Sequence, residues 1–178
     1  PYGRIFAGTL HLEDEENEAT LYRLDRDGTT EEMLTGLTLS NGLTWSPDHK
    51  WFYHIDTPTE TVRRYPYDLS SGTFGEGEVV VEFKDEDGFP DGMTSDEEGH
   101  LWIAHFAGGR VSRWNPETGE KVLEVMVPAP NVTSCCFIGD DLKQLAITTA
   151  REGMDDEALE KYPEAGSVFK IDTEVKGM

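Results

Sequence analysis

The sequence has few cysteines, few basic residues and no long apolar run, and each shortage excludes a class of protein. Its only cysteines, Cys135 and Cys136, are neighbours and cannot cross-link distant parts of a fold. We expect two thiols, one or both buried, in a reducing, cytoplasmic compartment, with a strained vicinal disulfide as the alternative. No apolar run approaches the ~18–20 residues of a membrane span, and no signal peptide is visible.

Positive charge is scarce. Lys and Arg number 15 against 36 Asp and Glu in 178 residues, which gives a formal net charge of −21. This field repels phosphate backbones and anionic membrane surfaces, so we expect neither nucleic acid nor membrane as a partner. The excess of acidic residues instead indicates a role in solubility, a surface that attracts cations, or adaptation to a high-salt habitat.

An initiator methionine is missing as well. The chain begins "PYGRIFAG", as if it started within a strand. We therefore expect a fragment of a longer protein or a processed chain.

What the sequence does contain is a series of short strand-like runs. They are rich in Val, Tyr, Phe, Trp and Thr and are separated by Gly, Pro, Asp and Asn, which predicts an all-β fold. One stretch, from about Asp155 to Tyr162, has a helical pattern that Pro163 ends.

The strand-like runs repeat. In "TLYRLDRDG", "TVRRYPYDLSSG", "RVSRWNPETGE" and "SVFKIDTEVKG" an apolar residue stands two positions before a cation, and successive copies are 41, 49 and 57 residues apart. A period of about 40–50 residues with about four strands per unit is typical of a β-propeller blade. We expect one partial β-propeller domain over residues 1–178, with blade-like units at about 1–39, 40–87, 88–131 and 132–178.

The last three units open with a polar step: "SNGLTWSPD", "PDGMTSDEEG" and "TSCCFIGDD". Because the innermost strand of a blade begins at the central channel, Asn41 and Asp91 would deliver two oxygen ligands to one place. Such oxygens suit calcium, magnesium or manganese and are accepted by zinc. Taken alone, Asn41-Gly42 is typical of a hairpin turn and Asp91 of a solvated loop.

At these motifs the sequence resembles the family of SMP-30 (regucalcin), gluconolactonases and luciferin-regenerating enzymes. The matching stretches are "GRIFAGTL", "SNGLTWSPDHKWFYHIDTPTETVRRYPYD", "PDGMTSDEEGHLWIAHFAGGRVSRWNPETGE", "TSCCFIGDDLKQLAITTAREGM" and "EAGSVFKID". The resemblance covers nearly the whole chain and roughly the C-terminal three fifths of the family pattern. It implies a six-bladed propeller that holds one divalent cation (Ca, Zn, Mg or Mn) and hydrolyses sugar lactones.

The resemblance also implies roles for individual residues. The metal-binding Asn and Asp of the family fall on Asn41 and Asp91, and Asp91 is the implied general base. The third protein ligand, an N-terminal Glu, and the substrate-binding Arg and Asn have no counterpart here, because the chain starts after that region. An intact site is therefore only partly supported by this sequence.

Four further residues are candidates for substrate binding. His105 would stand at the end of an inner strand, and Glu13 near the end of another, where family members carry substrate-contacting acids. Thr133 and Ser134 enter the last unit at the position that we equate with Pro90-Asp91. The alternatives are a packed histidine, an acid on a charged surface loop, and hydroxyls that satisfy a turn.

The expected activity is metal-dependent hydrolysis of a small-molecule sugar lactone. A metal can polarise the lactone carbonyl and lower the pKa of a bound water, while a nearby carboxylate accepts the proton. No Ser or Cys nucleophile is required, and the sequence contains no G-x-S-x-G motif.

Three alternatives stay open at this point. The first is a calcium-binding regulatory propeller without enzymatic activity, and the second is a related propeller esterase that acts on phosphotriesters. The third is a fragment that is inactive until complementary blades or a second copy cover its bare blade faces.

Overall fold

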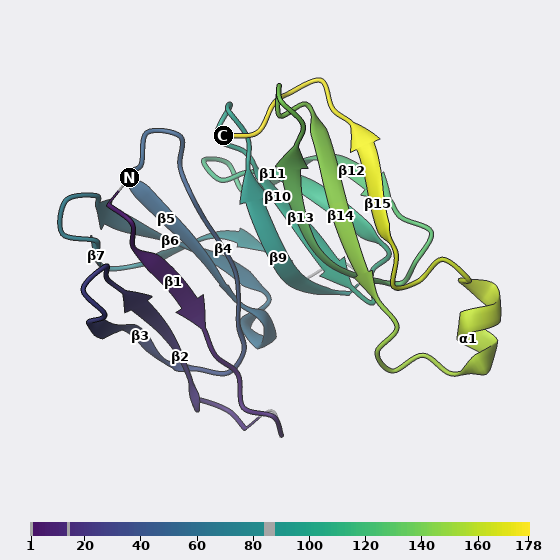
Figure 1. Cartoon of the computed structure of the whole chain (residues 1–178), viewed down its shortest axis with the longest axis horizontal. Coiled ribbons are helices and arrows are strands. Elements are labelled where there is room, and N and C mark those ends of the chain that lie inside the picture. Colours follow the sequence, from purple (N-terminus) through teal and green to yellow (C-terminus); the bar gives the residue numbers. More distant parts are fainter. Residues whose placement is uncertain (1, 14, 84–87) are drawn as a thin grey trace.

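The computed structural model of the chain describes residues 2–13, 15–83 and 88–178. Within these ranges the chain forms four antiparallel sheets, which we call blades 1 to 4 in chain order (Figure 1). The prediction of an all-β chain is confirmed, since the only α-helix within these ranges is a short one between the last two strands.

Blades 1 and 2 lie on the left in Figure 1. Blade 1 consists of β1 (Ile5–Gly8), β2 (Ala19–Leu24) and β3 (Thr30–Leu37). Blade 2 consists of β4 (Ser40–Trp45), β5 (Trp51–Asp56), β6 (Thr61–Asp68), β7 (Thr73–Phe74) and β8 (Glu78–Glu82), and the 3₁₀ helix η1 (Thr57–Thr59) joins β5 to β6.

Blades 3 and 4 lie on the right in Figure 1. Blade 3 consists of β9 (Phe89–Ser95), β10 (Leu101–Phe106), β11 (Arg110–Asn115) and β12 (Glu120–Met126). Blade 4 consists of β13 (Asn131–Ile138), β14 (Gln144–Ala150) and β15 (Val168–Asp172), with helix α1 (Asp156–Lys161) between β14 and β15. The predicted helix is confirmed: the Asp155 carboxylate accepts a 2.8 Å hydrogen bond from the Ala158 backbone N–H, as an N-cap does.

The blades meet along their innermost strands. Strand β4 packs against β9, and β9 packs against β13, so the first strands of blades 2, 3 and 4 lie side by side. Blade 1 reaches this row directly after β1, where the Ser40 backbone N–H donates a 3.2 Å hydrogen bond to the Thr9 carbonyl oxygen. Successive blades therefore present the starts of their inner strands at one end of the molecule.

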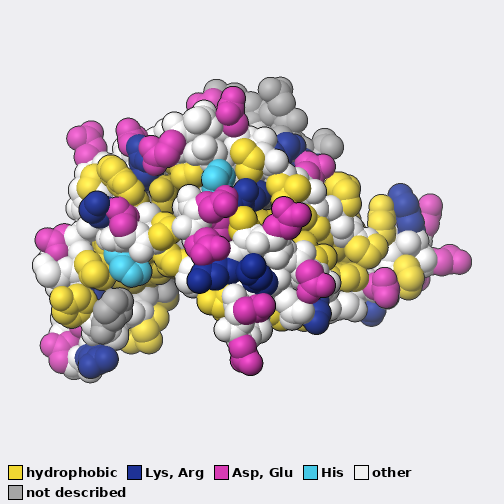
Figure 2. Space-filling view, turned by 90° about the horizontal axis from the view of Figure 1, so that it is seen from above, with side chains coloured by type: hydrophobic (Ala, Val, Ile, Leu, Met, Phe, Trp, Pro, Cys, Tyr) yellow, Lys and Arg dark blue, Asp and Glu magenta, His cyan; other side chains and the backbone are white. Residues whose placement is uncertain are grey.

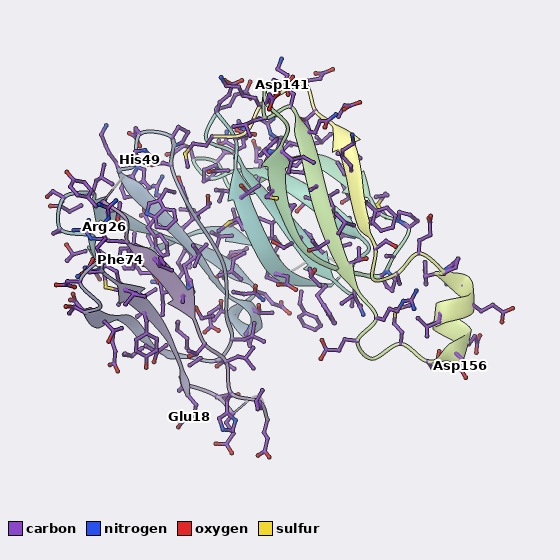
Figure 3. All side chains as sticks on the ribbon, viewed as in Figure 1. Glu18, Arg26, His49, Phe74, Asp141 and Asp156 are labelled. Atoms are coloured by element: carbon purple, nitrogen blue, oxygen red, sulfur yellow. The ribbon has the colours of Figure 1, made fainter. Side chains whose placement is uncertain are left out.

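Apolar side chains fill the spaces between the blades. Leu21, Phe52 and Tyr65 are buried between blades 1 and 2, where the Phe52 and Phe74 rings stack with centroids 4.4 Å apart (Phe74 is labelled in Figure 3). Separate buried clusters join blade 2 to blade 3 and blade 3 to blade 4. Burying one such aromatic side chain contributes about 2–3 kcal/mol, so these contacts set the stacking of the blades.

The charged side chains lie mostly outside the blades. Figure 2 shows carboxylates scattered over one face among apolar and basic groups. Asp96 is an exception, since it is fully buried and accepts hydrogen bonds from Arg113 Nε (2.7 Å) and Trp102 Nε1 (2.9 Å). No helix in the described part of the chain is long and apolar enough to cross a membrane.

Candidate functional site

The innermost strands of blades 2, 3 and 4 each carry a β-bulge close to their start. In β4, Asn41–Gly42 together oppose the single residue Ile55 of β5. In β9, Asp91–Gly92 oppose Ala104 of β10 in the same way, and in β13 the extra residue is Thr133. A bulge redirects a side chain out of the regular alternation of a strand and is common beside active sites.

The bulges also lie against one another. A Cβ atom added to Gly42 would collide with the Asp91 carbonyl oxygen and lie 2.8 Å from the Met93 Cβ, and one added to Gly92 would lie 2.8 Å from the Ser134 Cα. The two glycines therefore allow neighbouring inner strands to approach closely. Asn41 and Asp91 lie within strands and not in the turns before them, so the turn interpretation of Asn41-Gly42 is wrong.

Asn41 and Asp91 contact each other across the boundary between blades 2 and 3. Both are half-buried, and the Asn41 side chain lies beside the Asp91 carboxylate, where it favours the charged form. Burial raises the pKa of the Asp91 carboxyl to about 6, while the hydrogen bonds from Asn41 and from the Gly92 backbone N–H act in the opposite direction. The site therefore holds a carboxylate whose charge is poorly compensated by its surroundings.

This donor set fits a hard divalent cation. It offers one carboxylate and one carboxamide, and among the described residues Asn41 is the only side chain that stabilises the Asp91 charge. The set is incomplete, because no group of three or more His, Cys, Asp or Glu side chains in the described ranges is placed to hold a metal. Asn41 and Asp91 would thus supply part of a coordination shell, with further ligands from elsewhere.

Blade 4 repeats the bulge with different chemistry. The Thr133 Oγ1 lies 2.8 Å from Thr148 Oγ1, so its hydroxyl is shared with the adjacent strand. The pairing equates Val132 with Pro90, and therefore Thr133–Ser134 with Asp91–Gly92. The sequence alignment that equated Thr133-Ser134 with Pro90-Asp91 was wrong by one residue, because blade 4 has Ser134 in place of the glycine that marks this position in blades 2 and 3.

Glu13 lies on the exposed connection between β1 and β2. Its backbone N–H donates a 3.3 Å hydrogen bond to His11 Nδ1. In Figure 3 the labelled Glu18, from this connection, and Asp156, from the connection between β14 and β15, lie at one end of the sheets, with His49 and Asp141 at the other. Glu13 therefore belongs to the end at which β4, β9 and β13 begin, and its role in substrate binding stays a prediction.

His105 stands on β10, the second strand of blade 3, because β9 occupies the innermost place. It lies near the end of this strand, as expected, but not on the innermost strand of the blade. The ring is fully buried, and its Nε2 lies 2.6 Å from Ser112 Oγ within the blade. Contact of His105 with a substrate stays a prediction.

Two residues near the bulges were missed at the level of sequence. Thr57 Oγ1 accepts a 3.2 Å hydrogen bond from Asn41 Nδ2, and Thr148 shares the Thr133 hydroxyl. For Thr57 the sequence does offer a signal, since the polar run "DTPT" directly follows a strand. Thr148 lies in the middle of the run "QLAITTA" and has no such signal.

Comparison with known sequences identifies relatives along the whole chain. Residues 1–151 match the family model described as "SMP-30/Gluconolactonase/LRE-like region". The chain is 44% identical over 177 residues to a Bacillus subtilis (strain 168) protein named "Putative sugar lactone lactonase YvrE", and 44% identical over 173 residues to regucalcin of Danio rerio. The two matches cover 99% and 96% of this chain. They cover only 61% and 59% of the length of the two relatives.

Solved structures give the same result. A luciferin-regenerating enzyme superposes with a TM-score of 0.91 at 32% identity, and a calcium-binding protein, regucalcin, from Agrobacterium tumefaciens str. C58 superposes with a TM-score of 0.94 at 31% identity. Each comparison covers 100% of this chain and 61% or 60% of the other. The fold is that of a β-propeller, and the chain belongs to the SMP-30/gluconolactonase/LRE-like family.

Proposed function

We propose that the protein to which this chain belongs hydrolyses a sugar lactone at a site built around Asn41 and Asp91, with the help of a divalent cation. The supporting observation is the contact of these two side chains from equivalent bulges of neighbouring blades. Relatives named for lactonase activity make a cyclic sugar ester the preferred substrate class.

Asn41 and Asp91 would hold the cation through the amide oxygen Oδ1 and a carboxylate oxygen. When bound, the cation supplies Lewis acidity toward the lactone carbonyl. The chain's own contribution is to place both side chains next to each other on two neighbouring strands, which keeps them in place without help from a flexible loop.

Asp91 would also act as the general base. One carboxylate oxygen accepts a proton from the attacking water as a bond forms between the water oxygen and the lactone carbonyl carbon. The bond between that carbon and the ring oxygen then breaks, and the ring oxygen takes up a proton. The product is the open-chain hydroxy acid, so no covalent enzyme intermediate is required.

Thr133, Ser134 and Glu13 would contact the hydroxyl groups of the sugar. All three belong to the end at which the inner strands begin, and all three carry oxygen atoms that donate to or accept from a polyol. His105 is the weakest of the four substrate candidates, because its ring is enclosed within blade 3.

The proposal is tested by the variant Asp91→Ala in the complete protein. Sugar lactone opening is measured with and without a chelator, and Asp156→Ala, which removes an exposed carboxylate of α1, is the matched control. We expect Asp91→Ala to abolish the chelator-sensitive rate and Asp156→Ala to keep it. Undiminished cation-dependent hydrolysis by Asp91→Ala would refute the assignment.

A calcium-binding protein without turnover is the second candidate, because one solved neighbour is described as a calcium-binding protein. Calorimetry separates the two functions. Calcium binding that depends on Asn41 and Asp91, together with no hydrolysis of any sugar lactone, would favour this candidate over the lactonase.

A further inference from the structure

Thr57 connects the two blades that carry the candidate site. It is the first residue of η1, directly after β5. Its Oγ1 accepts a 3.2 Å hydrogen bond from Asn41 Nδ2 of blade 2 and donates a 2.8 Å hydrogen bond to the Pro90 carbonyl oxygen of blade 3. No motif of the sequence and no step of the proposed hydrolysis uses this hydroxyl.

The Pro90 carbonyl decides the direction of both bonds. A carbonyl oxygen only accepts, so the single hydroxyl proton of Thr57 is committed to Pro90. Toward Asn41, Thr57 can then only accept, and the Asn41 amide must present its NH₂ group. The other orientation of the amide would place two acceptors, Asn41 Oδ1 and Thr57 Oγ1, against each other without a proton between them.

The same orientation suits the contact with Asp91. The Asn41 side chain also favours the charged form of Asp91, and a carboxylate can accept only from its NH₂ group. Within the described ranges no hydrogen bond reaches Asn41 Oδ1. The amide oxygen is therefore the atom left over for a ligand.

Thr57 is itself held by the backbone around it. Its N–H donates a 3.1 Å hydrogen bond to the Leu39 carbonyl oxygen, and the Asp56 carboxylate accepts a 2.8 Å hydrogen bond from the Leu39 N–H. Pro58 restricts the backbone at the next position. The hydroxyl is thus fixed relative to β4, the strand that carries Asn41.

We propose that Thr57 is a positioning residue, which uses the acceptor-only carbonyl of Pro90 to lock the Asn41 amide with Oδ1 free to ligate the cation. This inference rests on the proposed function. Partners that orient a metal ligand typically contribute a factor of about 10–100 to metal affinity.

Calcium affinity of the complete protein, measured by calorimetry with CaCl₂ alone, tests the inference. Thr57→Val keeps the shape and removes the hydroxyl, and we expect about tenfold weaker binding. Thr57→Ser restores the hydroxyl and should restore the affinity. Thr59→Val is the matched control, because the Thr59 hydroxyl bonds to the Asp56 carbonyl oxygen and to Thr61 without reaching Asn41.

A second pair of variants shows whether Thr57 acts through Asn41. If it does, Thr57→Val has no further effect on calcium affinity in the Asn41→Ala background. An equal loss in both backgrounds would overturn the positioning role, and so would wild-type affinity of Thr57→Val beside a weakened Asn41→Ala. Wild-type affinity of Asn41→Ala would instead refute the proposed ligand, and the inference with it.

A readout without metal completes the test. In the metal-free protein the side-chain NH₂ protons of Asn41 should exchange with solvent more slowly than in Thr57→Val, as followed by nuclear magnetic resonance. Equal exchange rates of these protons in the two proteins would contradict the positioning role of Thr57, even if calcium affinity changed.

Discussion

The inner strands of blades 2 and 3 differ from that of blade 4 in chemistry and not in backbone form. All three carry a bulge at the same position. Blades 2 and 3 place an amide and a carboxylate there, each followed by glycine, whereas blade 4 places Thr133 followed by Ser134. The repeated bulge therefore orients one side chain in each blade in the same way. The type of that side chain decides whether it can act as a metal ligand.

The second strands differ in a related way. The pairing equates His54 of β5 with Ile103 of β10 and Ile147 of β14, and all three are buried. Blade 2 thus carries a titratable ring where the other two carry an aliphatic side chain. His54 Nε2 lies 2.8 Å from Ser40 Oγ, next to the bulge.

The largest difference between the blades should appear in activity. We expect Asn41→Ala to lower kcat/KM for a sugar lactone on the order of 100-fold, about 3 kcal/mol of transition-state stabilisation, because it removes an oxygen ligand. Thr133→Val at the equivalent bulge should cost less than about tenfold, since its hydroxyl is shared with Thr148. A greater loss for Thr133→Val than for Asn41→Ala would reverse the roles of the blades.

The next largest difference between the blades should appear in stability, through the packing at the bulges. Gly42→Ala inserts a methyl group against the Asp91 carbonyl oxygen, which cannot rotate away, and we expect a loss of about 2–3 kcal/mol in the free energy of unfolding. Ser134→Ala at the equivalent position of blade 4, where a Cβ is already present, should change it by less than about 1 kcal/mol. Denaturant titration measures both, and equal losses would remove the need for close strand approach at Gly42.

The buried histidine should make blade 2 sensitive to acid. Burial lowers the pKa of His54 to about 4, below its value in the unfolded chain. The unfolded state therefore binds more protons as the pH falls, and stability is lost from about pH 7 downward, by about 2 kcal/mol at pH 5. His54→Leu, which imitates Ile103 and Ile147, should remove this loss, as thermal unfolding at both pH values would show; an unchanged pH dependence would contradict it.

The smallest effect concerns the two thiols of β13. Both cysteines are free, and Cys135 is buried whereas Cys136 is exposed. Burial also raises the pKa of the Cys135 thiol, which suppresses the reactive thiolate. We expect a thiol reagent to label Cys136 in the native protein and Cys135 only after unfolding, as read by mass spectrometry, and Cys136→Ser to prevent native labelling. Absence of labelling until a reductant is added would indicate the vicinal disulfide instead.

Much of this architecture is predictable from sequence because it repeats. The strand-like runs, the helix near Asp155 and the matched positions of Asn41 and Asp91 all follow from local composition and spacing. Strand β3 (Thr30–Leu37) was not predicted, because it is largely exposed and lacks an apolar pattern. The opening residues of β4 and β9 lie outside the strand-like runs that the sequence shows, because Asn, Asp, Pro and Gly are depleted in strands.

The details of the site depend on contacts between blades, which local patterns do not encode. The register that equates Thr133 with Asp91 becomes visible only in the pairing of β13 with β14. The link from Thr57 to Pro90 joins residues 33 positions apart. Sequence could therefore suggest which residue types form the site, but not how their hydrogen bonds orient them.

The central claim is that Asn41 and Asp91 act as one unit, and a double-mutant cycle tests it most directly. The measurement is kcat/KM for a sugar lactone in the complete protein, with Asn41→Ala, Asp91→Ala and the double variant. If the two side chains serve one cation and one water, the double variant should be about as slow as Asp91→Ala alone. A double variant whose loss equals the product of the two single losses would contradict the claim, because it would mean that the two residues act independently.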